Sequence, residues 1–268
     1  MKITIIGAGN MGGAIARGLI NSAGVSPTDL TITAASEETL QNFQLEFPTI
    51  RTTRDNADAV VGATYVLLAV KPWLVPQVIE QIVPEFRPET ILLSVVAGIS
   101  CVELQEMVAS TCDNSDAIPI PVIRMMPNTA INYGESMTIL SSLGVSREEL
   151  ADVQSLMNTM GQTLVVDEKN LNAGMALASC GIAFVLKYIQ AAMQAGVELG
   201  LYPKQARQLV AQSCIGAGKI ILENEDSHPS VEIDKVTTPG GLTIKGINAL
   251  EEKGFSAAVL EAMRRSAT

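Results

Sequence analysis

Histidine is nearly absent from this sequence, and its scarcity limits the chemistry to expect. The chain of 268 residues contains one histidine, His228, which stands beside Pro229 in a polar break. A histidine in such a place is more often a turn or surface residue than a general base. A single histidine also provides no cluster of ring nitrogens for a metal, and we expect no metal site.

Cysteine is scarce as well, and the four that occur show no catalytic or metal-binding spacing. Cys101, Cys112, Cys180 and Cys214 are far apart, and the sequence contains neither C-x-x-C nor the G-x-S-x-G of serine hydrolases. Three of the cysteines lie in apolar or small-residue helical contexts, so we expect thiols of a hydrophobic core.

Basic residues are too few for a nucleic-acid-binding surface. There are 18 Lys and Arg against 28 Asp and Glu, a net charge of −10. Local cations such as Lys71 and Arg124 can still serve an anionic ligand. No signal peptide pattern opens the chain, and its most apolar helix, over residues 175–186, meets Lys187 before it is long enough to span a membrane. We therefore expect a cytoplasmic protein without nucleic-acid or membrane partners.

The first twenty residues carry the strongest pattern in the chain. Ile3, Ile5 and Ile6 form a short apolar run typical of a buried parallel strand. Residues 7–12 then read G-x-G-x-x-G, and a helical pattern follows at once. The first glycine allows a tight turn, Gly9 lets the backbone approach a pyrophosphate, and the last lets the helix lie close to the strand. The pattern predicts a dinucleotide-binding domain.

The end of the second expected strand, over residues 30–34, bears on the choice of cofactor. NAD-specific folds often carry an acidic residue at this point for the ribose hydroxyls, but this chain has Ala35 and Ser36. The absence of an acid leaves room for a 2′-phosphate, to which Ser36 can donate, although no arginine directly follows. We expect NADP as cofactor, with NADPH preferred and NADH as the alternative.

Strands and helices alternate over residues 1–167, which is typical of an α/β domain. Apolar strands are expected near residues 50–52, 64–70, 90–96, 122–129, 137–140 and 163–166, with a helix over 148–160. Small loops follow two of the strands, at Lys71-Pro72 and at Ala97-Gly98. The carboxyl ends of parallel strands face the ligand crevice, so both loops are candidates for cofactor contacts, although each alone is equally consistent with an ordinary turn.

From residue 168 the pattern becomes helical to the end of the chain. Helices are expected over residues 169–200 and from Pro203 through Ile221, followed by a break at 224–229. Residues 236–244 then lead into a helix that ends at Leu250, and a last helix is expected over 255–265. The sequence therefore predicts a Rossmann-type dinucleotide-binding domain over residues 1–167 and an all-helical domain over 168–268. Residues 175–221 carry apolar side chains on more than one helical face, which indicates a dimer or a larger dimer-based homo-oligomer.

A Pro-Gly-Gly turn before the penultimate helix is a candidate substrate site. The run Thr237-Thr238-Pro239-Gly240-Gly241-Leu242-Thr243 exposes consecutive N–H groups that can hold a carboxylate, with threonine hydroxyls beside them. A plain helix-capping turn explains the same residues equally well. A hydroxy-acid dehydrogenase would require a histidine or lysine to move the alcohol proton, whereas a protonated imine requires only a hydride and a hydroxyl partner.

Several segments together resemble the Δ1-pyrroline-5-carboxylate reductase family of proline biosynthesis. The matching segments occur in collinear order over nearly the whole chain, and the Pro-Gly-Gly turn is the most diagnostic. They are residues 7–12, 69–72, 97–99, 124–129, Glu168, 236–243, 250–251 and 254–255. The resemblance implies a Rossmann domain followed by a helical dimerisation domain, and an NAD(P)H-dependent reductase of a cyclic imine.

The resemblance also implies which residues contact the ligands. The implied cofactor contacts are Ile6, Gly7, Ala8, Gly9, Asn10, Met11, Ser36, Asn56, Ala69, Val70, Lys71, Pro72 and Ala97. The implied substrate contacts are Glu168, Thr238, Leu242 and Thr243, and the Pro-Gly-Gly turn adds Pro239, Gly240 and Gly241. Thr243 is the implied catalytic residue, donating a hydrogen bond to the imine nitrogen.

The chain departs from the family pattern over residues 175–184. The family's Thr-Ala-Leu-Ser-Gly-Ser-Gly-Pro-Ala-Tyr is replaced by Met-Ala-Leu-Ala-Ser-Cys-Gly-Ile-Ala-Phe, which removes hydroxyls at Met175, Ala178 and Phe184. Two alternatives follow from this departure: a reductase of another cyclic imine and a non-catalytic dinucleotide-binding regulatory dimer. A third alternative, which rests on a shared architecture, is a β-hydroxyacid dehydrogenase. The last requires a catalytic lysine on the long helix, where Lys187 stands rather late.

Overall fold

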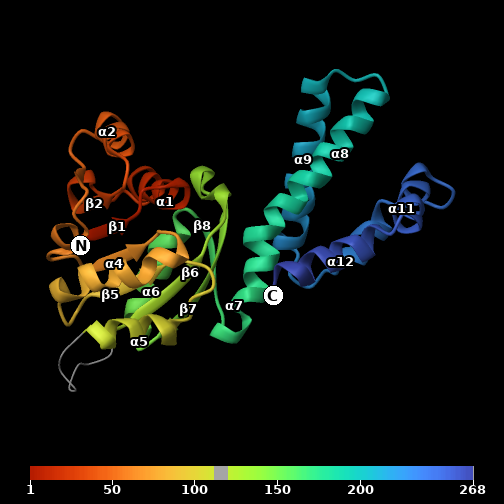
Figure 1. Cartoon of the computed structure of the whole chain (residues 1–268). Coiled ribbons are helices and arrows are strands. Elements are labelled where there is room, and N and C mark those ends of the chain that lie inside the picture. Colours follow the sequence, from red (N-terminus) through yellow and green to blue (C-terminus); the bar gives the residue numbers. More distant parts are fainter. Residues whose placement is uncertain (112–119, 268) are drawn as a thin grey trace. The chain divides into compact units, whose positions relative to one another are not determined.

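The computed structural model describes residues 1–111 and 120–267 of the chain (Figure 1). They form two compact units, Met1–Ser179 and Cys180–Thr268. Cys112, one of the cysteines expected in a core, lies outside the described residues.

The first unit is built on a mostly parallel sheet. Within the described residues the sheet has eight strands in the order β3-β2-β1-β4-β5-β6-β7-β8, so the strand order, but not the strand direction, reverses between β1 and β4. All neighbouring pairs are parallel except β6 and β7. The strands are β1 (Ile3–Ile6), β2 (Leu30–Thr33), β3 (Arg51–Thr53), β4 (Tyr65–Leu68), β5 (Ile91–Ser94), β6 (Val122–Met126), β7 (Ser136–Leu143) and β8 (Gly161–Val165).

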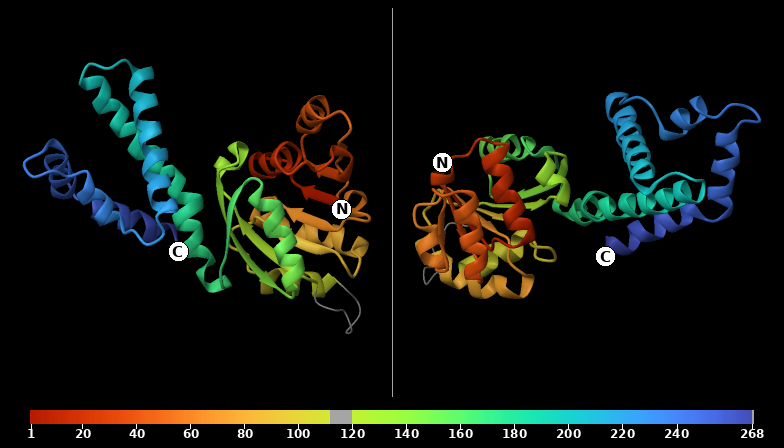
Figure 2. Two further views of the ribbon diagram at one scale, coloured as in Figure 1. Left: turned by 180° about the vertical axis from the view of Figure 1, so that it is seen from behind. Right: turned by 90° about the horizontal axis from the view of Figure 1, so that it is seen from above.

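Helices cover both faces of this sheet because its central strands are buried on both sides. The α4 and α5 helices lie in front of the sheet in Figure 1, and α6 comes to the front when the molecule is turned by 180° (Figure 2). The helices of this unit are α1 (Asn10–Asn21), α2 (Glu37–Glu46), α3 (Asn56–Val60), α4 (Val75–Ile82), α5 (Cys101–Thr111), α6 (Arg147–Asn158) and α7 (Leu171–Met175).

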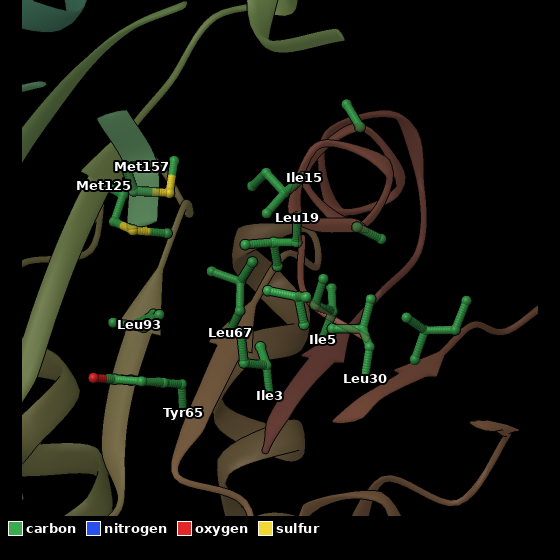
Figure 3. Packing of buried hydrophobic residues seen from close by; sticks show 14 of the residues in the cluster. Ile3, Ile5, Ile15, Leu19, Leu30, Tyr65, Leu67, Leu93, Met125 and Met157 are labelled. Atoms are coloured by element: carbon green, nitrogen blue, oxygen red, sulfur yellow. The ribbon is translucent and has the colours of Figure 1, made fainter. Parts of the chain in front are cut away.

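Two large hydrophobic clusters and a small third one lie between helices and sheet among the described residues. In Figure 3, Ile5, Ile15 and Leu19 gather with Leu30 and Leu67 under α1. A second cluster lies under α3, α4 and α5 and contains Cys101, which is 0% exposed. Cys101 is thus a core thiol as predicted, and the predicted Rossmann-type α/β unit is confirmed.

Residues 168–179 belong to the first unit, although the sequence places the domain boundary at residue 167. Leu171 is 1% exposed and packs with Met126 of β6 and Ile139 of β7. The helical stretch therefore begins on the sheet, continues through a π-helical turn over Ala176–Cys180, and only then enters the second unit.

The second unit contains only helices among its described residues. They are α8 (Gly181–Glu198), α9 (Pro203–Glu223), α10 (Pro229–Lys235), α11 (Leu242–Glu252) and α12 (Phe255–Ser266). The sequence does not predict α10, which begins at Pro229 with His228 as its cap. The Nδ1 atom of His228 accepts a hydrogen bond from Ser230 N at 3.2 Å, as suits a turn residue.

Within a single chain, this helical unit buries very few of its described residues. Of its described residues only Gly181 and Ala206 are buried, whereas Leu186, Leu209 and Ile215 are 57%, 58% and 53% exposed. Five helices with this much exposed apolar surface require a second surface to cover them.

One helical run among the described residues is long and apolar enough, by length and composition alone, to cross a membrane. It covers Glu168–Glu198, and its most apolar window has a mean hydropathy of 1.5 with 11% of its residues buried. The expectation that Lys187 leaves this helix too short is therefore wrong, because one lysine does not interrupt it. Such a helix is weak support for a membrane span, since apolar helices that are covered in soluble proteins pass the same test.

Candidate active site

The glycine-rich segment at the start of α1 contains three glycines in different environments: Gly7 and Gly9 in the loop after β1, and Gly12 in the first turn of the helix. A Cβ atom at Gly7, where φ is +100°, would lie 2.8 Å from the carbonyl oxygen of Ala69. A Cβ atom at Gly12 would overlap the carbonyl oxygen of Gly7 and lie 2.9 Å from the Cβ of Ala69. Around Gly9 no atom lies within 4 Å of the added Cβ. Gly7 and Gly12 are required by the fold, whereas Gly9 leaves its surroundings open.

The start of α1 is available to an anion. Gly9 caps the helix with φ −74° and no side chain accepts a hydrogen bond from the first turn. A groove of about 550 Å³ adjoins this helix start and is lined by Gly9, Asn10 and Met11, with Arg17 of α1 and Thr39 of α2. Free N–H groups at a helix start, an uncrowded glycine and an open groove fit the pyrophosphate of a dinucleotide.

Ser36 and Asn56, expected at the adenosine end, are held near the ends of β2 and β3. Ser36 caps α2, and its Oγ accepts a hydrogen bond from Thr39 N at 3.4 Å, which leaves its own O–H as a donor. The Oδ1 of Asn56 accepts from Thr33 Oγ1 at 2.8 Å, and its Nδ2 donates to Gln81 at 2.9 Å. The sheet therefore fixes Asn56, while Ser36 keeps a hydroxyl proton for a phosphate.

Ala69 and Ala97 lie in the loops that follow β4 and β5. Ala69 N donates to the carbonyl oxygen of Ile6 at 2.9 Å, which joins the first of these loops to the glycine-rich loop. Lys71 and Pro72 are exposed, and next to them Trp73, the only tryptophan in the sequence, is 73% exposed. Ala97 is exposed as well. The predicted cofactor residues thus occupy the carboxyl ends of neighbouring strands.

Glu168 is bonded within the Rossmann unit. Its Oε1 accepts hydrogen bonds from Arg124 Nη1 at 2.9 Å and from the backbone N of Cys101 at 2.7 Å. Burial disfavours the carboxylate, but the hydrogen bonds from Arg124 and Cys101 outweigh it and hold the Glu168 pKa below its ordinary value. Burial, together with the charge of Glu168, raises the pKa of the Cys101 thiol to about 12.

The Pro-Gly-Gly segment lies in the helical unit and forms an open helix start. Gly240 has a φ of +71°, Gly241 N donates to Thr238 O at 3.0 Å, and Gly241 caps α11 without a side-chain hydrogen bond. Leu242 is 86% exposed, and Thr243 is exposed on the first turn of the helix. Free N–H groups and a threonine hydroxyl therefore occur together here, in a different compact unit from the glycine-rich loop.

Two family models match the chain. The model described as pyrroline-5-carboxylate reductase dimerisation covers residues 168–268, and one described as NADP oxidoreductase, coenzyme F420-dependent, covers residues 2–98. The chain is 34% identical to pyrroline-5-carboxylate reductase 2 of Dictyostelium discoideum, over 99% of this chain and 91% of that protein. It is 31% identical to pyrroline-5-carboxylate reductase of Escherichia coli, over 98% of this chain and 95% of that protein. The chain belongs to the pyrroline-5-carboxylate reductase family.

Solved structures of pyrroline-5-carboxylate reductases agree with this assignment. The Plasmodium falciparum enzyme, solved with NADP bound, superimposes with a TM-score of 0.87 at 26% identity, covering 100% of this chain and 95% of that one. The Streptococcus pyogenes enzyme gives a TM-score of 0.84 at 29% identity, covering 100% and 96% of the two chains. Both confirm the predicted combination of a Rossmann-type unit and a helical unit.

The segment in which this member departs from the pyrroline-5-carboxylate reductase pattern contributes contacts that the sequence did not predict. Ser179 Oγ lies 3.2 Å from Met126 O and 2.9 Å from Pro127 O, to which it donates, and Asn128 Nδ2 donates to Ala178 O at 3.3 Å. These bonds tie the π-helical turn to the loop after β6. The signal was present in the sequence, because the departure adds a hydroxyl at Ser179 while removing others.

Proposed function

We propose that the protein is a pyrroline-5-carboxylate reductase that forms L-proline with NADPH. The observation that carries this proposal is the alignment with named reductases over the full chain, at 34% identity to the Dictyostelium discoideum protein. The open glycine-rich loop and the uncapped start of α11 supply the two helix-terminus sites that such a reaction requires.

The residues of the Rossmann unit bind and orient the cofactor in this proposal. The start of α1 and Gly9 hold the pyrophosphate, and Ser36 donates to the 2′-phosphate, which favours NADPH over NADH. The loops at 69–72 and 97–98 lie along the nicotinamide half. When bound, NADPH supplies the hydride for the imine carbon.

The residues of the helical unit bind the substrate. The free N–H groups at the start of α11 receive the ring carboxylate, since a helix N-terminus favours an anion. As hydride adds to the imine carbon, the C=N π electrons become a lone pair on the ring nitrogen, which keeps its proton, and Thr243 Oγ1 donates a hydrogen bond to that lone pair. Thr238 and Leu242 border the same segment, and Thr243 is the proposed catalytic residue.

The proposed assembly is a homodimer, or a larger oligomer of such dimers, formed through the helical unit. The family model that matches residues 168–268 is described as a dimerisation module. The exposed apolar side chains of α8 and α9 provide the surface that a second copy covers. A cytoplasmic location remains a prediction.

The test is NADPH oxidation, followed by absorbance, when pyrroline-5-carboxylate is added to the purified protein. We expect turnover with NADPH and a higher KM with NADH. Binding of NADPH without turnover would contradict the proposal and favour the regulatory dimer to which the altered 175–184 segment points. Turnover of only a different cyclic imine would favour the alternative reductase.

A further inference from the structure

The carboxylate of Glu168 joins three segments that are far apart in the sequence. Glu168 begins the 168–179 stretch, and its carboxylate accepts hydrogen bonds from Arg124 in the middle of β6 and from the first backbone N–H of α5, at Cys101. Oε1 makes both bonds, at 2.9 and 2.7 Å, so this oxygen is fully engaged within the protein. The side chain is 29% exposed, compared with 76% for its neighbour Asp167.

The ion pair between Arg124 and Glu168 differs from an ordinary surface ion pair because Arg124 is buried. The side chain of Arg124 is 6% exposed, and among the described residues its Nε has no hydrogen-bond partner. Among the described residues, the ion pair with Glu168 balances the charge of this buried guanidinium. A buried charge that loses its counter-ion is strongly unfavourable, so the pair holds both side chains in place.

The loop before α5 is exposed between buried ends. Ala97 and Gly98 are exposed, Gly98 has a φ of +79°, and no atom lies within 4 Å of a Cβ built there. The loop is held at its second end by Ser100, which shares reciprocal hydrogen bonds with Glu103, and by Cys101, whose N–H donates to Glu168. Between its buried ends the loop thus has few contacts of its own.

We infer that Glu168 is a positioning residue for the Ala97–Gly98 loop, and through it for the nicotinamide, rather than a group that contacts the substrate. The inference rests on the proposed function, because that function places the nicotinamide beside this loop. It replaces the substrate-facing role that the family resemblance implies for Glu168. Arg124, for which the sequence predicted an anionic ligand, finds that anion in Glu168.

The two roles differ in which ligand loses affinity when the carboxylate is removed. A substrate contact affects the KM for pyrroline-5-carboxylate and leaves NADPH binding unchanged. A positioning residue for the nicotinamide loop weakens NADPH but not 2′,5′-ADP, because 2′,5′-ADP ends before the nicotinamide. Calorimetric titration of the full-length oligomer with each ligand, in the absence of substrate, separates the two roles.

For Glu168→Ala we expect about tenfold weaker NADPH binding and unchanged 2′,5′-ADP binding, a size typical of a lost charge-assisted hydrogen bond. Glu168→Gln keeps an acceptor oxygen and should restore most of the affinity. Asp167→Ala is the matched control, because Asp167 is exposed and its recorded ion pair is with Lys169 at 3.5 Å. This variant should bind both ligands as the wild type does.

Wild-type NADPH affinity in Glu168→Ala, with a raised KM for pyrroline-5-carboxylate, would overturn the inference and restore the substrate contact. Equal losses of NADPH and 2′,5′-ADP would also overturn it. If the alanine variant does not fold, the glutamine variant decides alone: a selective, smaller loss of NADPH affinity supports the inference and no loss contradicts it. Wild-type protein that binds NADPH but does not reduce the imine would refute the proposed function while leaving this binding comparison intact.

Discussion

Alanine substitutions at Gly12 and Gly9 should have different effects, because Gly12 is required for the fold of the cofactor site whereas Gly9 lies where the cofactor binds. Gly12→Ala places a methyl group against the carbonyl oxygen of Gly7 and the Cβ of Ala69, so the start of α1 must move. Overpacking of this kind costs about 1–3 kcal/mol. For a unit of this size we expect the melting temperature to fall by roughly 2–12 °C.

Gly9→Ala should behave differently, because its methyl group meets no atom within 4 Å and the φ of −74° suits any residue. Its stability should change by no more than about 0.5 kcal/mol. The methyl group instead occupies the side from which a pyrophosphate approaches. We expect NADPH binding to weaken by about 10- to 100-fold, which corresponds to ~1.4–2.8 kcal/mol.

The assay combines thermal unfolding with NADPH titration. Trp73 is the only tryptophan and follows the 69–72 loop directly, so its fluorescence should report cofactor binding. Wild-type NADPH affinity in Gly9→Ala would refute the assignment of the pyrophosphate to this loop. A melting temperature as low as that of Gly12→Ala would refute the reading of Gly9 as an uncrowded position.

The remaining predictions concern the substrate, the phosphate, acid stability and assembly. Thr243→Val should lower kcat by about 10- to 100-fold with unchanged NADPH affinity, somewhat less than the loss at an oxyanion site; wild-type turnover would move the donor to Thr238 or water. Ser36→Asp should raise the KM for NADPH more than that for NADH by like-charge repulsion, and equal rises would exclude a 2′-phosphate there. The pKa of Glu168 is lowered in the folded protein, so its carboxylate stabilises the fold fully above the ordinary glutamate range; that contribution should be lost as the pH falls below this range and through the lower pKa of the folded state. Acid unfolding curves of wild type and Glu168→Gln should therefore converge at low pH, and a constant offset would contradict the assignment. Light scattering at micromolar concentration should give at least a dimer mass, and a monomer mass would contradict the proposed assembly.

The Rossmann unit could be predicted well because its signals are local. Gly7, Gly9 and Gly12 stand at fixed spacing between an apolar run and a helical pattern, and the structure finds each in the kind of environment that the spacing predicts. The strands were also found, but their directions were not. β7 runs antiparallel to β6 because a short connection, rather than a long crossover helix, joins them.

Hydrogen bonds in the candidate site could not be predicted from the sequence where a side chain and its partner lie far apart along the chain. Glu168 and Cys101 are 67 residues apart, and nothing in either local sequence indicates that one accepts a hydrogen bond from the other. Ser179 is visible in the sequence as an added hydroxyl, but its partners are not, since the carbonyl groups of Met126 and Pro127 lie 53 and 52 residues away. Helix α10 was missed because it is a short polar segment without a clear apolar period.

The helical unit has almost no hydrophobic core of its own, and this affects how the chain folds. Since Gly181 and Ala206 are its only buried residues among those described, α8 and α9 gain most of their stabilisation only when another molecule arrives. In the proposed assembly, the Rossmann unit folds within one chain, whereas the helical unit is completed only by association with another chain. The rate of this association should therefore rise with protein concentration during refolding. Before that association, the exposed apolar residues of α8 and α9 are of the kind that makes folding intermediates prone to aggregation.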